Sequence, residues 1–330
     1  MNEEIIHAEN LTKKFEDLVA VDNISFNVNK GEIFAFLGPN GAGKSTTLSI
    51  FATLSKPTSG SVKINGFDII TQKNDVRSSI GMVFQDTTLD DELTAYENMD
   101  FHGRLYNVPK EIRKKRIMEL LELVELEKRK DSLVKTFSGG MKRRLEIARG
   151  LLHEPKILFL DEPTLGLDPQ TRNKLWEYIK RLNTEHGLTI ILTTHYMEEA
   201  DKLCNRMAII DHGKIIVLDT PENLKNKIGG DVITFNTANK KNLSAVLAKY
   251  KWCKTIKMHD DSVTINVDKA ENKIAELVRI AQKNNIKIDS ITMNKPSLED
   301  VFLYFTGKTI REEESSNLDH MRLRKRMFRR

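Results

Sequence analysis

The octapeptide GPNGAGKS at residues 38–45 constrains the fold of this chain more than any other stretch. It follows the apolar run GEIFAFLG and opens a segment of helical character, so its glycines lie between a buried strand and a helix. This context distinguishes it from an ordinary glycine-rich turn. In the spacing G-x-x-x-x-G-K-[ST], backbone N–H groups turn toward phosphate oxygens, the lysine reaches the β and γ phosphates, and the hydroxyl can ligate Mg²⁺. We therefore expect a phosphate-binding loop made of Gly38, Pro39, Asn40, Gly41, Ala42, Gly43, Lys44, Ser45 and Thr46.

Three short apolar runs, at 31–38, 156–163 and 189–195, predict buried strands of a parallel sheet. Helical stretches lie between them, including 112–127 and 170–185, a pattern typical of an α/β domain with both faces of its sheet covered. The segment RMAIIDHGKIIVLDT adds a hairpin that turns at Asp211-His212-Gly213. The expected fold class is an α/β P-loop NTPase domain with a mixed sheet, over residues 1–228.

The pattern changes near Gly229-Gly230. Segments between 231 and 294 read as strand, helix, strand, strand, helix, strand, which is the order of a ferredoxin-like unit. Ser297, followed by Asp300, can cap a last helix. We expect a small α+β domain at 229–306 and a mobile basic tail at 307–330.

The composition limits the classes of partner. Lys and Arg number 52 against 47 Asp and Glu, but six of the basic residues crowd the last ten positions, which leaves the rest of the chain near neutral. A near-neutral body argues against a nucleic-acid partner, while the tail suits contact with anionic lipid or plain solvation. The two cysteines, Cys204 and Cys253, suggest neither a disulfide framework nor a zinc site. We also expect no membrane-spanning segment and no signal peptide, because no apolar run is long enough.

Acidic residues follow the second buried strand. Asp161 ends the run ILFLDE, where its carboxylate can hold a metal's water shell, and Glu162 comes next. Beside a P-loop, we interpret Glu162 as the general base or the group that orients the attacking water, rather than a solvated helix start. His195 ends the third strand, where a neutral imidazole could bond the γ phosphate, although a structural role is the alternative.

A second turn suited to phosphate occurs far downstream, in TFSGGMKRRLEIARG. Ser138, Gly139 and Gly140 precede a helix and offer N–H groups and a hydroxyl to an anion. Since the P-loop already surrounds the phosphates of its own nucleotide, this turn is useful if it closes on a nucleotide held by another subunit. The sequence therefore predicts two chains arranged head to tail, each completing the other's site.

Taken together, the chain resembles the nucleotide-binding subunit of an ABC transporter. Six motifs carry the resemblance: GPNGAGKST as Walker A, Gln85 in GMVFQD as the Q-loop, FSGGM as the signature, ILFLDEP as Walker B, LGLD ending at Asp168 as the D-loop, and His195 as the switch histidine. They cover about residues 5–220. The resemblance implies ATP and Mg²⁺ as cofactors and a helical subdomain at about 86–150.

The resemblance also implies roles for particular residues. Phe15 would stack on adenine, with packing in the core as the alternative. Gln85 would join Ser45 and Asp161 around the metal and, with Lys44, take part in catalysis. Asp168 of the D-loop would contribute to the nucleotide site.

Within ABC proteins, the segments FSGGMKRRLEIARGL, THYMEEAD and PSLEDVFLYFTG resemble the daunorubicin resistance type of export ATPase. The chain departs from the commonest ABC pattern at Phe15, Phe137, Met141 and Gly166. Because Met141 replaces the usual glutamine, it cannot make that side chain's hydrogen bonds to ribose or phosphate. The Ser138, Gly139 and Gly140 turn is intact, so we expect activity.

The resemblance implies a homodimeric ATPase at the cytoplasmic face of the cell membrane, powering export of a small, hydrophobic or drug-like compound through a separate permease. The segment 86–99, with Leu89 and Leu93, would meet that permease. One alternative is a non-transport ABC switch that acts on nucleic acid or ribosomes, although such proteins usually carry two ATPase halves or a coiled-coil insertion. Another alternative is an importer ATPase whose C-terminal domain senses a ligand. For that domain, a purely structural role is the other interpretation.

Overall fold

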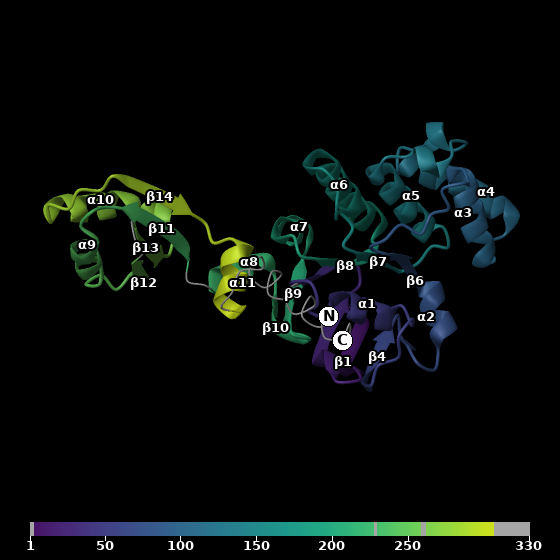
Figure 1. Cartoon of the computed structure of the whole chain (residues 1–330), viewed down its shortest axis with the longest axis horizontal. Coiled ribbons are helices and arrows are strands. Elements are labelled where there is room, and N and C mark those ends of the chain that lie inside the picture. Colours follow the sequence, from purple (N-terminus) through teal and green to yellow (C-terminus); the bar gives the residue numbers. More distant parts are fainter. Residues whose placement is uncertain (1–2, 228–229, 259–261, 307–330) are drawn as a thin grey trace, which may run out of the picture. The chain divides into compact units, whose positions relative to one another are not determined.

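The computed structural model describes residues 3–227, 230–258 and 262–306. These residues form two compact units that divide between Asp219 and Thr220 (Figure 1). The division lies earlier than the expected residue 228, because helix α8 (Pro221–Lys227) packs against α11 (Leu298–Thr306) and so belongs to the second unit.

A six-stranded mixed sheet forms the centre of the first unit. Its order is β10-β9-β3-β8-β7-β6, and every neighbouring pair is parallel except β10 with β9. The strands are β3 (Ile33–Leu37), β6 (Ile80–Val83), β7 (Ile157–Asp161), β8 (Thr189–Thr194), β9 (Arg206–Asp211) and β10 (Lys214–Asp219). Every residue of β3, β7 and β8 is buried, which explains why these strands are continuous apolar runs. The α/β fold, its mixed sheet and its 206–220 hairpin are confirmed.

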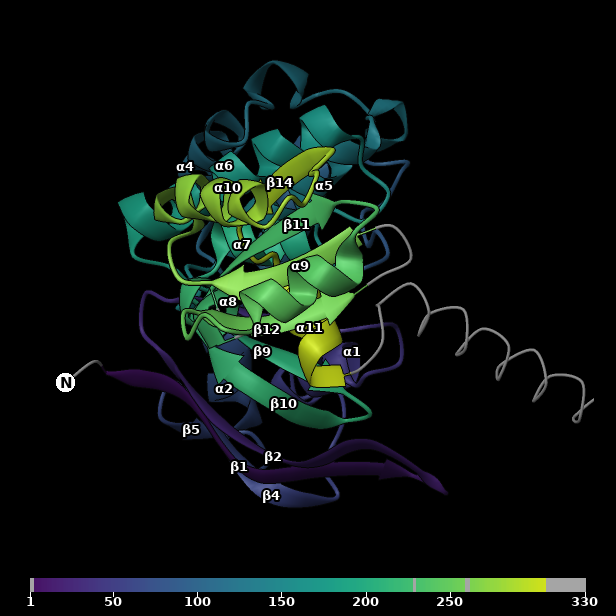
Figure 2. The same cartoon turned by 90° about the vertical axis from the view of Figure 1, so that its left-hand side faces the viewer.

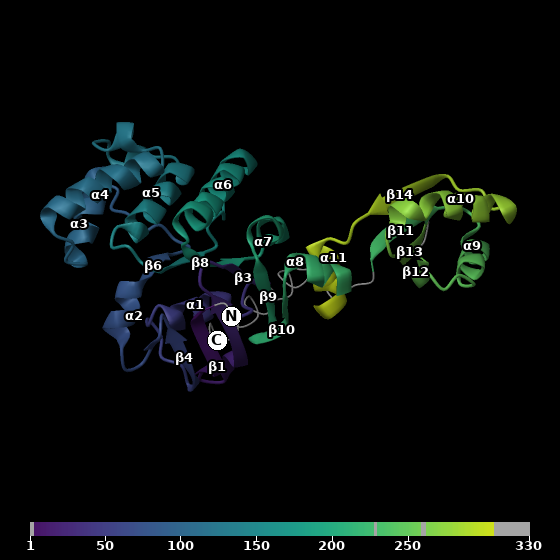
Figure 3. The same cartoon turned by 180° about the vertical axis from the view of Figure 1, so that it is seen from behind.

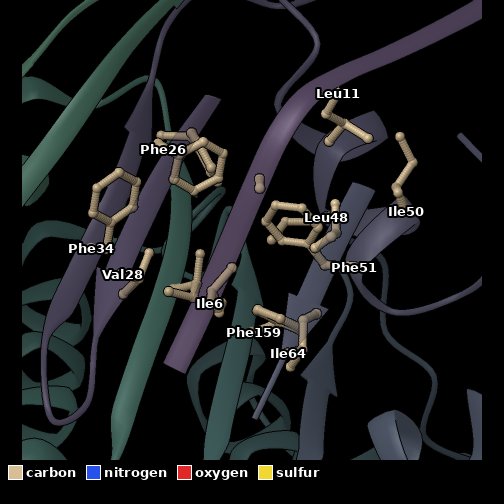
Figure 4. Packing of buried hydrophobic residues seen from close by; sticks show 14 of the residues in the cluster. Ile6, Leu11, Phe26, Val28, Phe34, Leu48, Ile50, Phe51, Ile64 and Phe159 are labelled. Atoms are coloured by element: carbon tan, nitrogen blue, oxygen red, sulfur yellow. The ribbon is translucent and has the colours of Figure 1, made fainter. Parts of the chain in front are cut away.

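A second, antiparallel sheet in this unit was not predicted from the sequence. Its order is β2-β1-β4-β5, formed by β1 (Glu4–Phe15), β2 (Leu18–Asn29), β4 (Ser59–Ile64) and β5 (Phe67–Asp68), and Figure 2 shows β1, β2 and β4 side by side. Helix α1 (Lys44–Phe51) begins at the P-loop, and its Leu48 and Phe51 join the core that both sheets share. Figure 4 shows Phe51, Phe159 of β7 and Ile6 of β1 in this core, where the ring centroids of Phe51 and Phe159 lie 6.1 Å apart.

Helices cover the rest of the first unit. Between β6 and β7 lie α3 (Ala95–Leu105), α4 (Lys110–Leu123) and α5 (Gly139–Leu151), which pack against one another (Figure 1). The remaining elements are α2 (Lys73–Ser79), the short helices η1 (Glu127–Arg129) and η2 (Val134–Thr136), α6 (Pro169–His186) and α7 (Met197–Leu203). Helix α5 also contacts α6 and β6, so the helix that follows the Ser138 turn is tied to the central sheet.

The second unit is the expected ferredoxin-like arrangement. Its antiparallel sheet has the order β12-β13-β11-β14, and the helices α9 and α10 lie on the same side of it (Figure 3). The elements are β11 (Asp231–Asn236), α9 (Lys240–Leu247), β12 (Cys253–Met258), β13 (Ser262–Val267), η3 (Ala270–Asn272), α10 (Ile274–Lys283) and β14 (Ser290–Asn294). Ser297 and Asp300 exchange hydrogen bonds at the start of α11, as the sequence predicts. The predicted tail at 307–330 lies outside the described residues.

Candidate active site

The P-loop connects β3 to α1 and is held from two sides. The N–H of Gly213, in the β9–β10 turn, donates to the carbonyl of Ala42 at 3.0 Å. A side chain on Gly38 would overlap the carbonyl of Ile210, and one on Gly43 would overlap the carbonyl of Ala20. These two glycines are therefore required for close packing of the loop against β9 and β2, in addition to any contact with phosphate.

Lys44 is buried at the start of α1 and folds back over the loop. Its Nζ donates to the carbonyl oxygens of Gly38 at 2.7 Å and Pro39 at 3.1 Å. It also lies 3.5 Å from Oε1 of Glu162. The ammonium group is therefore fixed between the loop and the end of β7, where a phosphate held by the loop N–H groups would reach it.

Ser45 and Asp161 are brought together across a long stretch of sequence. The Ser45 hydroxyl donates to Oδ1 of Asp161 at 3.0 Å. The Thr193 hydroxyl of β8 donates to the same carboxylate oxygen. A hydroxyl and a carboxylate are the oxygen ligands that Mg²⁺ prefers, so this pair fits a magnesium ion that also takes phosphate and water ligands.

Glu162 lies directly after β7 in a backbone conformation that non-glycine residues seldom adopt, with φ at 45°. Its N–H donates to the Thr193 hydroxyl at 3.0 Å, and its carboxylate lies 3.3 Å from Nδ1 of His195. Burial raises the pKa of Glu162, but the contacts with His195 and Lys44 outweigh burial and leave that pKa below its usual value. Glu162 is therefore ionised at neutral pH, as a general base must be.

Several of these groups line one open cavity of about 620 Å³. Its polar side chains include Lys44, Ser45, Gln85, Glu162 and His195. The exposed apolar side chains that line it are Phe15, Leu18, Val19 and Leu165. Phe15 is 48% exposed, which argues against packing in the core. Nζ of Lys13 lies 4.6 Å from the centroid of its ring, so one face of the ring contacts Lys13.

The predicted Ser138 turn is not among the residues that line this cavity. Its hydroxyl accepts from the N–H of Met141 at 3.3 Å and caps α5. Asp168 likewise caps its own helix, accepting from the N–H groups of Gln170 and Thr171 at the start of α6. Within one chain, neither Ser138 nor Asp168 lines the cavity that contains Lys44 and Glu162.

The structure also shows important residues that the sequence did not single out. Arg143 and Glu146 of α5 are buried and pair with each other, and Arg143 also donates to the carbonyl groups of Asp161 and Pro163 on either side of Glu162. Thr193 binds both Asp161 and Glu162. The sequence did offer a signal for Arg143 and Glu146, because the two are oppositely charged and lie three residues apart on a helix face that is otherwise apolar. In the segment 86–99, which was expected to meet a permease, Leu89 is only 9% exposed in this chain, and that call stays a prediction.

Comparison with known proteins decides the family. The ABC transporter profile matches residues 21–165, and a profile described as the C-terminal domain of DrrA1-3-like ATP-binding proteins matches residues 220–306. Over 312 residues the chain is 39% identical to the linearmycin resistance ATP-binding protein LnrL of Bacillus subtilis, covering 93% of this chain and 100% of that protein. The chain belongs to the ABC transporter ATP-binding proteins.

Other relatives of this ABC ATP-binding protein agree. It is 35% identical to the daunorubicin/doxorubicin resistance ATP-binding protein DrrA of Streptomyces peucetius, covering 92% of each chain. It is 38% identical to the Nod factor export ATP-binding protein I of Sinorhizobium fredii, covering 93% of this chain and 87% of that one. The resemblance to the daunorubicin resistance subfamily is therefore confirmed.

Solved ABC structures cover about two thirds of this chain. The subunit cbiO1 from Clostridium perfringens, part of the ABC transporter complex cbiONQ, has a TM-score of 0.64 and 31% identity, covering 68% of this chain and 92% of that chain. A dimeric cassette, MJ0796 bound to ADP and Pi, has a TM-score of 0.58 and 33% identity, covering 65% and 98%. This ABC protein is accordingly a nucleotide-binding ATPase. Among its described residues, no helix is long and apolar enough to cross a membrane.

Proposed function

We propose that this chain hydrolyses ATP to drive export of a small, hydrophobic or drug-like compound through a separate membrane permease. The observation that carries the catalytic part is the convergence of Lys44, Glu162 and His195 on the cavity that also contains Ser45. The export part rests on the relatives, whose names specify linearmycin, daunorubicin or doxorubicin resistance and Nod factor export.

We expect apolar residues to contact the base of the nucleotide and polar groups to contact its phosphates. The apolar surface that includes Phe15 would hold the adenine ring, and the P-loop N–H groups would hold the phosphates. Lys44, which is buried, would shift its donors from loop carbonyl oxygens to the β and γ phosphates. The P-loop contacts proposed here are Gly38, Pro39, Asn40, Gly41, Ala42, Gly43, Lys44, Ser45 and Thr46.

Mg²⁺ would be held by Ser45 and Gln85 directly and by Asp161 through its water shell. Within the described ranges no three acidic, His or Cys side chains form a metal site, which fits an ion that takes much of its coordination from phosphate and water. When bound, the ion would neutralise charge on the phosphates. Glu162 would orient and deprotonate the attacking water, and His195 would fix the Glu162 carboxylate and bond the γ phosphate.

The cavity that contains Lys44 and Glu162 is open to solvent, and the Ser138 turn does not line it. We infer that a second chain, arranged head to tail, supplies Ser138, Gly139 and Gly140 to the γ phosphate, with Asp168 at the same interface. Support comes from the position of the Ser138 turn outside its own chain's cavity and from the dimeric MJ0796 cassette. N–H groups at the start of α5 would then face the nucleotide opposite the P-loop.

We further propose that the dimer binds the cytoplasmic face of its permease. The family supplies ATP-binding subunits to membrane transporters. The last ten residues carry six Lys or Arg, a composition that suits contact with anionic lipid at that face.

The Glu162→Gln substitution tests the catalytic assignment. It keeps the size and hydrogen bonding of the side chain but removes its charge, so we expect nucleotide affinity to remain and turnover to fall by about 10²-fold or more. Steady-state phosphate release and equilibrium binding of a fluorescent ATP analogue measure the two quantities.

The matched control is Glu198→Gln, which makes the same change on an exposed side chain that pairs with Lys202. We expect Glu198→Gln to hydrolyse ATP at the wild-type rate. Wild-type turnover in Glu162→Gln would remove Glu162 from the catalytic role.

A further inference from the structure

Arg143 lies in the second turn of α5. Its guanidinium group contacts the segment at Phe84, the segment 161–163 and Glu146 of its own helix. Its side chain is buried, with Nε donating to the carbonyl of Pro163 at 2.9 Å and Nη2 donating to the carbonyl of Asp161 at 2.8 Å. Its Nη1 donates to the carbonyl of Phe84 and to Oε2 of Glu146, the latter at 3.1 Å. The planar fork of arginine is suited to bonding several oxygens at once, which a lysine ammonium cannot do in the same geometry.

Two of these carbonyl groups flank Glu162. The Asp161 carbonyl belongs to the peptide bond that leads into Glu162, and the Pro163 carbonyl lies just beyond it. Glu162 itself has φ at 45°, a conformation that persists in a non-glycine residue only when its surroundings hold it. Arg143 therefore fixes the backbone on both sides of the strained residue, while Thr193 binds its N–H.

The same helix also holds the segment that begins at Gln85. Arg143 binds the carbonyl of Phe84, immediately before Gln85, and Glu146 accepts from the N–H of Thr88 at 2.8 Å. One turn further, Arg149 donates to the carbonyl of Thr88 at 2.8 Å. Side chains three apart on one face of α5 thus bind both ends of segment 84–88.

We propose that Arg143 is the positioning residue for Glu162, holding its backbone turn in the hydrolytic conformation and joining that turn to the Gln85 segment and to the helix that starts at Ser138. In this proposal α5 has two roles. Its first turn binds the nucleotide of the partner subunit, and its Arg143 positions the general base Glu162 of its own chain. The inference rests on the proposed role of Glu162 but concerns a residue that does not itself touch nucleotide.

The direct test is Arg143→Lys in the full chain. Lysine keeps the positive charge beside Glu146, but its single nitrogen cannot reach the three carbonyl groups that the three guanidinium nitrogens of Arg143 bond, so Glu162 should lose its fixed position. We expect kcat to fall about 10- to 100-fold while nucleotide affinity stays within about two-fold, because the P-loop is untouched. The matched control is Arg144→Lys on the next position, where Nη1 binds the carbonyl of Val124 at 2.8 Å, away from the site, and where we expect kcat to be unchanged.

Arg143→Gln, which keeps two N–H donors, is measured alongside it, with melting temperatures for every variant. Wild-type kcat in a folded Arg143 variant would overturn the proposal. So would equal losses of kcat and nucleotide affinity, or failure of both variants to fold, because each outcome indicates a role in general stability.

A double variant separates this proposal from the assignment of Glu162. If Arg143 acts through Glu162, adding Arg143→Lys to Glu162→Gln should lower turnover no further. A further drop equal to that seen in the wild-type background would refute the link to Glu162. If instead Glu162→Gln alone hydrolyses ATP normally, the proposed function fails first, which is a distinct result.

Discussion

Two buried glutamates near the site have pKa values shifted in opposite directions, and the charge of their neighbours explains the difference. Glu162 faces His195 and Lys44, which overcome the effect of burial and lower its pKa. Glu199 on α7 is fully buried, and its Oε1 accepts from two neutral donors, the Thr164 hydroxyl at 2.9 Å and the Trp176 indole at 3.0 Å. Burial is the largest influence on Glu199 and raises its pKa, and the hydrogen bonds from its neighbours and the charge of Arg172 lower that pKa by less than burial raises it.

Glu199→Gln should therefore make stability less sensitive to pH. A raised pKa in the folded state stabilises the protein fully below the ordinary value of 4.5, and this stabilisation is lost as pH rises through the folded pKa. Glutamine cannot ionise, so the Glu199→Gln protein does not lose this stabilisation. The difference in melting temperature between Glu199→Gln and wild type should therefore rise from pH 4.5 to pH 8. Thermal unfolding across this range measures the difference, and a constant difference would contradict the raised pKa. Glu199→Ala, the control, should lose about 1–3 kcal/mol for each donor left unpaired.

At the scale of elements, the two glycines that begin α5 have different roles in the structure. A side chain on Gly140 would overlap Cγ2 of Thr171 at the start of α6, whose hydroxyl bonds Asp168. A Cβ on Gly139 would meet only Cδ2 of Leu167, at an ordinary 3.6 Å. Gly140 is therefore needed for the close approach of α5 and α6, whereas Gly139 has room for a Cβ in this chain.

Alanine substitutions should separate these roles. Gly140→Ala must move a branched side chain, so it should lower the free energy of unfolding by about 1–3 kcal/mol. Gly139→Ala should leave that free energy within about 1 kcal/mol while reducing ATP hydrolysis, because its added methyl group would face the partner's nucleotide. Denaturant unfolding and phosphate release measure both effects. Equal destabilisation by the two substitutions would contradict this division.

The sequence predicted the elements that carry periodic apolar runs or fixed motifs. The P-loop, the strands that lead to Asp161 and His195, and the ferredoxin-like order were readable because burial on both faces or strict alternation marks them. Strands β1 and β2 were missed, since their pairing has several register shifts and their apolar alternation is interrupted by polar residues. The contacts of Arg143 could not be predicted, because its partners are backbone carbonyl groups far along the chain.

At the scale of the whole molecule, we propose that one chain contains the parts of two incomplete nucleotide sites. Lys44, Glu162 and His195 converge on one cavity, while the Ser138 turn lies outside that cavity and uses its side chain to cap its own helix. If the site is composite, hydrolysis requires two chains, and nucleotide must draw them together. The helix start at Gly139 is the surface that must close on the partner's phosphate.

Sedimentation velocity of the Glu162→Gln protein, with and without saturating ATP and Mg²⁺, tests this claim most directly. Since Glu162→Gln should bind ATP without hydrolysing it, we expect a monomer without nucleotide and a dimer with it. Adding Gly139→Trp should leave nucleotide affinity intact but keep the protein monomeric, because the bulky ring blocks closure of the turn on the partner's nucleotide. A Glu162→Gln protein that binds ATP yet stays monomeric, or a Gly139→Trp double variant that dimerises as readily, would contradict the composite site.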